Sequence, residues 1–205
     1  PLFKVYISKN AINNVARVLD SGFTGEGPEV KLFEKDLKKF FNLYKKKLNI
    51  VLVNSGTSAE HLIYHILKKG HIFENFNWKK ISKNEEVISS PLTSQATNWP
   101  ILLNGLKIKW ADIDKKTLNI SLKDVEKKIN EKTRIISIVH FAGNPVDIFK
   151  LKKIVNKAER KYKKKIIIIE DCAHSFGSVH RNGELVGCSG NISTFSLQSI
   201  KHVTS

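Results

Sequence analysis

The sequence predicts an α/β fold of three layers, in which helices cover both faces of a mostly parallel sheet. Short apolar runs rich in β-branched residues alternate with segments of helical spacing over about 150 residues, a pattern typical of right-handed βαβ crossovers. Residues 166–169 are four consecutive isoleucines, as expected of a strand buried on both faces. With 205 residues, 41% of them hydrophobic, the chain is long enough for one domain with a substantial core.

Two helices are predicted near the N-terminus. Residues 10–20 carry apolar side chains at helical spacing and end at Ser21-Gly22, a typical helix stop. After a glycine-containing loop at residues 23–27, Pro28 stands at a favoured first-turn position of the second helix. The apolar stripe of that helix runs through Val30, Phe33, Leu37 and Phe40 or Phe41.

Residues 50–53 are predicted to form the first strand, followed by a small polar turn at residues 54–58 and a third helix. Such a turn offers backbone N–H groups and the positive end of a helix dipole to a phosphate. Gly56 permits close backbone approach, and Thr57 and Ser58 add hydroxyl donors. No GxxxxGK[ST] motif is present, and the residues alone leave phosphate binding and a plain helix N-cap both open.

The middle of the chain predicts further strands at residues 87–90, 106–110 and 134–139, with residues 71–85 as an irregular surface segment. Ser121 and Asp147 each stand where a helix begins. Asp112 and Asp114 are more typical of a loop than of a metal site, so no metal is expected. His140 follows a strand, where it either lines a pocket or has a structural role.

The C-terminal residues 165–205 bring chemically distinctive groups to the ends of two strands. Glu170 and Asp171 follow the strand at 166–169, and a strand at 192–197 leads to Lys201. Ligands of open α/β sheets bind outside the carboxyl ends of the strands. There a desolvated lysine can form a Schiff base with a carbonyl, and an aspartate can pair with a pyridinium nitrogen. The alternative is that Asp171 only caps its strand and Lys201 is one of many surface lysines.

The amino-acid sequence of this region resembles that of a known family. EDCAHSFG, a glycine-rich segment and then TFSLQSIKH are similar to the cofactor segment of the DegT/DnrJ/StrS sugar aminotransferases, which depend on pyridoxal 5'-phosphate and have the aspartate aminotransferase fold, fold type I. The resemblance implies that Asp171 holds the pyridine nitrogen and that His174 contacts the ring hydroxyl. It further implies that Ser196 binds the phosphate and that Lys201 is the Schiff-base lysine.

Two further segments carry the resemblance. The Ser-Gly-Thr turn is similar to the family's phosphate-binding turn, which implies that Gly56, Thr57 and Ser58 contact the cofactor phosphate. Residues 91–100 resemble the segment over the cofactor ring, where the family commonly has an aromatic residue at the position of Ser94. Either Ser94 contacts the ring as a smaller group, or Trp99 or another aromatic residue stacks on it.

The resemblance covers residues 21–202 and implies that residues 1–205 form the cofactor-binding large domain. Because the family continues for a comparable length after the lysine, we expect this domain to be truncated there and the C-terminal small domain to be absent. The implied reaction moves an amino group from an amino acid, glutamate, to a nucleotide-linked keto sugar in cell-surface polysaccharide (lipopolysaccharide) or amino-sugar biosynthesis. The implied assembly is a homodimer.

An alternative within the family is a pyridoxal-phosphate-dependent sugar-nucleotide dehydratase, in which a histidine replaces the lysine. Lys201 argues against it, although His202 stands next to that position. Another alternative is a basic nucleic-acid-binding α/β module, because the net charge is +16. The lysines fall in runs at the ends of amphipathic helices without interleaved aromatic residues, which indicates solvated faces, and we expect no nucleic-acid partner.

The remaining composition points to a protein away from membranes. No run of about 18 apolar residues occurs, so no membrane span is expected. The two cysteines, Cys172 and Cys188, lack paired metal-ligand spacing. Such sparse cysteine usage fits a reduced, cytoplasmic setting.

Overall fold

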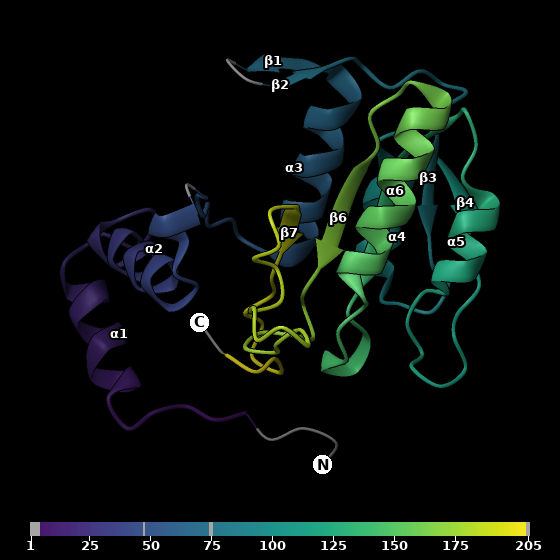
Figure 1. Cartoon of the computed structure of the whole chain (residues 1–205). Helices are drawn as coiled ribbons and strands as arrows, with labels where there is room; N and C mark the ends of the chain where they lie inside the picture. The colour runs from purple at the N-terminus through teal and green to yellow at the C-terminus, as the bar shows by residue number, and fades with distance from the viewer. Residues whose placement is uncertain (1–4, 47, 74–75, 204–205) are drawn as a thin grey trace. The chain divides into compact units, whose positions relative to one another are not determined.

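The structure is a computed structural model that describes residues 5–46, 48–73 and 76–203. The chain divides into two compact units, one of Pro1–Asn54 with Leu197–Ser205 and one of Ser55–Ser196. Figure 1 traces the chain through its helices and strands.

The first unit contains both predicted N-terminal helices. Helix α1 spans Ala11–Asp20, α2 spans Pro28–Phe40, and a short 3₁₀ helix, η1, spans Leu43–Lys46. Gly27 is the N-cap of α2 and Pro28 is its first residue, as the pattern predicted. The apolar side of α2 buries Leu37, next to the buried Phe41 and Leu43.

The predicted strand at residues 50–53 is wrong. Residues 48–54 form no strand, and Val51 is 75% exposed. A strand requires a neighbour that pairs with its backbone N–H and C=O groups, and no described strand pairs with this segment. The apolar run therefore has the composition of a strand without the partner that would make it one.

The second unit is built on a five-stranded parallel sheet in the order β4-β3-β5-β6-β7. Its strands are β3 (Glu86–Ser89), β4 (Lys107–Trp110), β5 (Thr133–Val139), β6 (Ile167–Asp171) and β7 (Ile192–Thr194). Its helices are α3 (Gly56–Lys69), α4 (Gln95–Leu103), α5 (Leu122–Lys128), the 3₁₀ turn η2 (Phe141–Gly143) and α6 (Ile148–Tyr162). The parallel sheet is confirmed, and the last strand is shorter than the 192–197 predicted.

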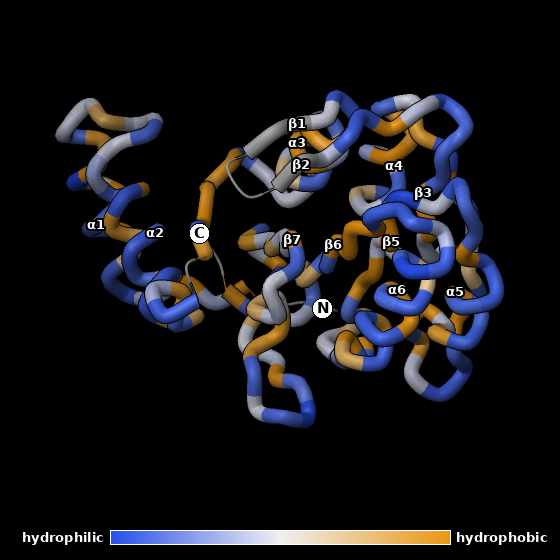
Figure 2. Tube along the Cα trace, turned by 45° about the horizontal axis from the view of Figure 1, so that its top comes forward, coloured by the Kyte–Doolittle hydropathy of each residue, from blue (hydrophilic) through white to orange (hydrophobic). Residues whose placement is uncertain are grey.

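Helices cover both faces of this sheet, which confirms the three-layer α/β architecture. One core joins sheet residues such as Ile136 and Ile168 to α5 and α6, and a second joins Ile135 and Ile169 to α3 and α4. Consecutive strand residues thus point into opposite cores, because side chains alternate along a strand. Burying each such isoleucine contributes about 1.5–3 kcal/mol. Figure 2 shows the apolar sheet strands between helices with hydrophilic outer residues.

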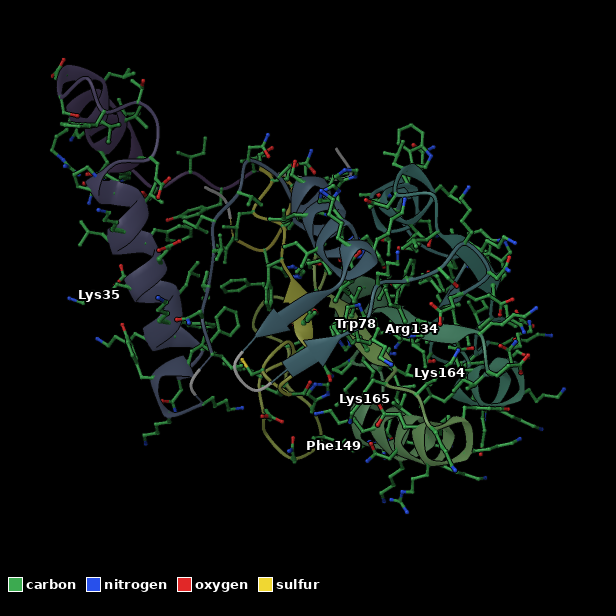
Figure 3. All side chains as sticks on the ribbon, turned by 90° about the horizontal axis from the view of Figure 1, so that it is seen from above. Lys35, Trp78, Arg134, Phe149, Lys164 and Lys165 are labelled. Atoms are coloured by element: carbon green, nitrogen blue, oxygen red, sulfur yellow. The ribbon has the colours of Figure 1, made fainter. Side chains whose placement is uncertain are left out.

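A β-hairpin stands where an irregular segment was expected. Strands β1 (His71–Phe73) and β2 (Phe76–Trp78) pair antiparallel after α3. The buried Trp78 Nε1–H donates to the Leu67 carbonyl oxygen at 2.6 Å, and the Arg134 guanidinium lies 4.1 Å from the centroid of its ring (Figure 3). Arg134 also pairs with Glu85 at 3.1 Å. These contacts fix the hairpin to the end of α3 and to β5.

Within the described part of the chain, every helix is too short or too polar to cross a bilayer.

Candidate cofactor site

Asp171 is the last residue of β6, and only 6% of it is exposed. Both of its carboxylate oxygens accept hydrogen bonds: Oδ2 from the Thr97 hydroxyl at 2.6 Å, and Oδ1 from the Ala173 backbone N–H at 2.9 Å. The Thr97 hydroxyl lies 2.7 Å from that of Thr93, one turn earlier in the segment that enters α4. The carboxylate is therefore held in one orientation at the carboxyl end of a central strand.

The Ser-Gly-Thr turn begins α3 directly. Ser55 is the N-cap, and its Oγ accepts from the Ser58 backbone N–H at 3.0 Å. The first N–H groups of a helix have no intrahelical partners and carry the positive end of its dipole. The plain N-cap is thus present, and the phosphate-binding role of Gly56, Thr57 and Ser58 stays a prediction.

Gly56 approaches the end of β7 closely. A Cβ added at Gly56 would lie 3.3 Å from Ser196 Cβ and 3.4 Å from the Phe195 carbonyl oxygen. Two residues for which the resemblance implied phosphate contacts are therefore neighbours, although 140 positions separate them (196 − 56). Thr194, two residues before Ser196, is the register partner of Asp171 on the adjacent strand. Asp171, Gly56 and Ser196 thus lie around the carboxyl ends of β6 and β7.

The remaining sequence-predicted residues lie as follows. Half-buried His174 follows β6 and packs edge-on against Phe141, with 6.1 Å between ring centroids. Ser94 is exposed and caps α4, accepting from the Ala96 backbone N–H at 3.3 Å. Lys201 belongs to the first unit, where its backbone N–H donates to the Gln198 carbonyl oxygen at 2.8 Å. That Lys201 shares a pocket with Asp171 stays a prediction, as do cofactor contacts of His174 and Ser94.

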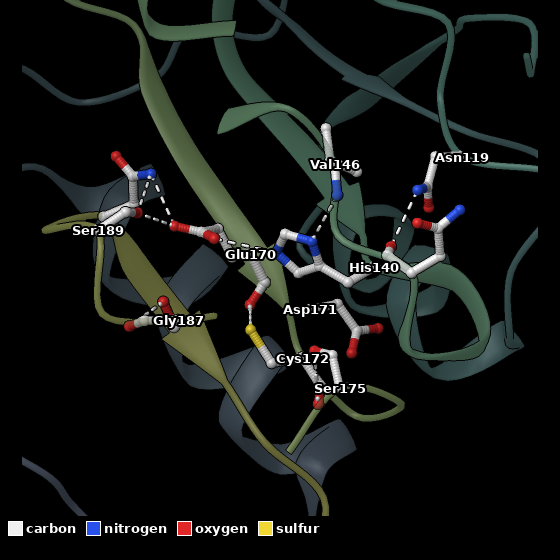
Figure 4. Close-up of polar contacts among 12 residues, drawn as sticks. Asn119, His140, Val146, Glu170, Asp171, Cys172, Ser175, Gly187 and Ser189 are labelled. Carbon is white, nitrogen blue, oxygen red and sulfur yellow. Dashed lines mark hydrogen bonds and ion pairs between the residues drawn. The ribbon is translucent and has the colours of Figure 1, made fainter. Parts of the chain in front are cut away.

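A buried polar network lies behind Asp171 (Figure 4). His140, fully buried, bonds through Nε2 to Glu170 Oε2 at 2.9 Å, and its Nδ1 accepts from the Val146 backbone N–H at 3.0 Å. Because Nδ1 is an acceptor, the ring proton is on Nε2, which donates to the carboxylate. Ser189 and Asn191 donate to the other Glu170 oxygen. His140 is therefore a structural residue that fixes the end of β6.

The electrostatics of this network follow from its hydrogen bonds. Burial alone raises the pKa of Glu170, but the donors His140, Ser189 and Asn191 outweigh it and lower that pKa below its usual value. Burial raises the pKa of the Cys172 thiol well above its usual value, so the thiol stays protonated. Ligand atoms of His140, Glu170 and Cys172 lie within 4.8 Å of one another. Each of the three side chains has a protein hydrogen-bond partner, and Cys172 Sγ donates to the Glu170 carbonyl oxygen at 3.6 Å.

Sequence reasoning missed Thr97, Thr194 and Glu60. The Thr97 hydroxyl bonds Asp171 across 74 positions, and the Thr194 hydroxyl donates to Glu60 Oε1 at 2.5 Å across 134 positions. A signal for Glu60 was available, because it is an acid on the face of α3 that buries Tyr64 and Leu67 at i+4 and i+7. The two threonines had no such signal.

Comparison with known proteins decides the family. The family model described as the DegT/DnrJ/EryC1/StrS aminotransferase family matches residues 5–205. The chain belongs to this family. A DegT-family relative, GDP-4-keto-6-deoxy-D-mannose 3-dehydratase of Yersinia pseudotuberculosis, is 33% identical over 99% of this chain and 47% of its own length. The chain thus spans about half the length of the curated relatives it matches.

Solved structures of the family superpose on the whole chain. The sugar aminotransferase CalS13 from Micromonospora echinospora matches with a TM-score of 0.87 and 36% identity, covering 100% of this chain and 51% of that one. The Escherichia coli GDP-4-keto-6-deoxy-D-mannose-3-dehydratase with bound hydrated PLP matches with a TM-score of 0.84 and 26% identity, covering 100% and 48%. Both reactions, amino transfer and dehydration, thus occur among DegT-family relatives of this chain.

Proposed function

We propose that this DegT-family chain binds pyridoxal phosphate and serves an aminotransferase that moves an amino group from an amino acid, glutamate, to a nucleotide-linked keto sugar. The observation that carries the proposal is the set of groups at one end of the sheet. A fixed, buried Asp171 carboxylate lies on β6, and the turn at Gly56 touches Ser196 beyond β7. A carboxylate and a donor-rich turn match the two polar ends of a phosphorylated pyridine.

Pyridoxal phosphate, when bound, supplies an aldehyde that condenses with amines and a ring that withdraws electrons. Asp171 would accept the ring N–H, and the bonds from Thr97 and Ala173 orient its carboxylate in advance. The first backbone N–H groups of α3 and the Ser196 hydroxyl would hold the phosphate. Gly56 has no side chain at the point where the backbone must come close.

Lys201 carries the reactive amine in this proposal. Its Nζ would hold the cofactor through the aldehyde in the resting protein. As a free amine, the same Nζ would move the proton at the donor α-carbon, as general base and then acid. His174 would bond the ring hydroxyl and Ser94 would contact the ring face. We further propose that the protein works as a cytoplasmic homodimer in cell-surface polysaccharide or amino-sugar biosynthesis.

The second candidate is dehydration of the sugar, which the 33% identical 3-dehydratase relative favours. Lys201 argues against it, because the family resemblance implies a histidine in place of the lysine in dehydratases. Apart from the residue at position 201, both candidates use the same cofactor residues, and they differ in whether nitrogen reaches the sugar.

The test is incubation of the chain with pyridoxal phosphate, ¹⁵N-glutamate and a panel of nucleotide-linked keto sugars, with mass spectrometry of the products. We expect ¹⁵N in one sugar product, its loss in Lys201→Ala and its retention in Lys150→Ala, an exposed lysine on α6. A product that loses a hydroxyl without gaining ¹⁵N would identify a dehydratase. Unchanged sugars contradict the proposal, and salt-sensitive binding of DNA or RNA without cofactor would favour the nucleic-acid module.

A further inference from the structure

Glu60 is a carboxylic acid buried in the apolar interior of the second unit. It lies in the second turn of α3, 2% exposed, on the helix face that also buries Tyr64 and Leu67. A buried carboxyl is costly unless it is paired, hydrogen-bonded or neutral. Its presence among core residues therefore requires a physical explanation.

The contacts of Glu60 join it to the strand pair that carries Asp171. Oε1 accepts from the Thr194 hydroxyl at 2.5 Å, while Oε2 has no hydrogen-bond partner among the described residues. Thr194 is the β7 residue in register with Asp171, and its carbonyl oxygen accepts from the Cys172 backbone N–H at 2.8 Å. Glu60 is thus hydrogen-bonded to Thr194, and Thr194 lies beside Asp171 on the adjacent strand.

The charge that acts on Glu60 is negative and therefore disfavours the ionised form of its carboxyl group. Asp171 on β6 is the charged group that acts on it, and no cation among the described residues does so. The other ionisable groups coupled to it are Tyr64 on α3 and Cys172 after β6, and burial raises the pKa of both. Burial, and then the Asp171 charge, raise the pKa of Glu60 to about 8, against the lowering effect of the Thr194 hydrogen bond.

The hydrogen-bond pattern is consistent with a neutral acid. In a protonated carboxyl, one oxygen remains an acceptor and the other becomes an O–H donor. The Thr194 hydroxyl already donates to Oε1, which assigns the proton to Oε2.

We propose that Glu60 is a positioning residue that stays neutral at physiological pH and so leaves Asp171 as the single carboxylate charge on the α3/α4 face at this end of the sheet. Glu170, one residue earlier on β6, points to the opposite face and bonds to His140 there. The part of this inference that concerns the cofactor rests on the proposed function. One lone carboxylate pairs with one ring N–H. A second carboxylate beside Asp171 would cause the two acids to share a proton, because two close carboxylates do not both ionise, and Asp171 would then be a weaker acceptor for the ring N–H.

The retained proton is tested first without cofactor, through the pH dependence of unfolding in Glu60→Gln and the unaltered chain. Glutamine has the shape of the acid and is neutral at every pH. A folded-state pKa above the unfolded value means that the folded chain holds more protons between pH 4.5 and about 8, so stability falls as pH rises through this window. Relative to Glu60→Gln, the unaltered chain should lose up to about a thousand-fold in its folding equilibrium constant.

Two single variants move the transition in opposite directions. Thr194→Val removes the hydrogen bond that lowers the Glu60 pKa and should shift the transition to higher pH, whereas Asp171→Asn should shift it to lower pH. A constant stability difference between the unaltered chain and Glu60→Gln from pH 5 to 8 would overturn the proposal, whatever the cofactor does.

The cofactor part is then read from pyridoxal phosphate affinity, measured by fluorescence titration. The two chains should bind it equally at pH 6.5 and diverge above pH 8, where only the unaltered chain gains a charge at position 60. A several-fold difference in affinity between the two chains already at pH 6.5 would show that Glu60 does not act as a neutral residue there and would overturn the inference. Failure of both chains to bind would refute the proposed function and the cofactor coupling, and the unfolding profiles would still decide the retained proton.

Discussion

Gly187 lies in the loop that leads into β7, and replacing it by alanine tests how that loop supports Ser196. Its φ is +82°, and an added Cβ would lie 2.5 Å from Phe195 Cζ and 3.2 Å from Cys172 Sγ. A left-handed backbone costs a residue with a side chain about 1–2 kcal/mol. Overpacking against the Phe195 ring adds about 1–3 kcal/mol, so Gly187→Ala should destabilise the second unit by about 2–5 kcal/mol.

Urea unfolding followed by tryptophan fluorescence measures this loss. All three tryptophans, Trp78, Trp99 and Trp110, lie in the Ser55–Ser196 unit, so the signal reports that unit. Gly183→Ala is the matched control, because Gly183 has φ +81° and no atom within 4 Å of the added Cβ. It should lose only the backbone part, about 1–2 kcal/mol. Equal losses in the two variants would refute the packing of Phe195 against Gly187.

Further predictions concern the network behind Asp171 and the turn that begins α3. Glu170→Ala should cost about 3–5 kcal/mol in urea unfolding, because it leaves the buried His140 N–H and its neighbouring donors unpaired. Because the folded pKa of Glu170 is lowered, the stability that its carboxylate contributes is present above the usual pKa of 4.5 and is lost as pH falls. Glu170→Gln should therefore flatten the acid side of the profile of unfolding free energy against pH. An unchanged acid side would contradict the hydrogen-bond assignment. Ser55→Ala should cost about 1 kcal/mol through its lost N-cap. Thr57→Ala should keep an unfolding free energy within about 0.5 kcal/mol of the unaltered chain and yet weaken phosphate binding. If Ser55→Ala weakened phosphate binding and Thr57→Ala did not, the binding group would be Ser55 instead.

The central sheet was predictable from sequence because its strands are buried on both faces. The runs around Ile136 and Ile168 are continuous and apolar, and both became strands of the parallel sheet. The equally apolar residues 50–53 did not, since a strand depends on a partner that local sequence does not specify. The hairpin ending at Trp78 was missed for a related reason, because its buried indole is held by Leu67 and Arg134.

The site was predictable only where residues stand at the ends of strands. Asp171 could be assigned to the carboxyl end of a strand, and Gly56 and Ser196 followed from the family resemblance, with their contact then found in the structure. Thr97 and Glu60 act on this region through hydrogen bonds that span 74 and 134 positions. Only the folded chain brings such residues together, so no local pattern could have identified their partners.

The most direct test of the central claim is borohydride reduction of the chain after incubation with less than one equivalent of pyridoxal phosphate, followed by peptide mass mapping. The chain has 31 lysines that could take the label, so the distribution of the label is informative. A desolvated amine near the cofactor site should outcompete solvated lysines. We predict one dominant label on Lys201, lost in Lys201→Ala and weakened in Asp171→Ala. Label spread over exposed lysines, with Lys201 unmodified, would contradict the account.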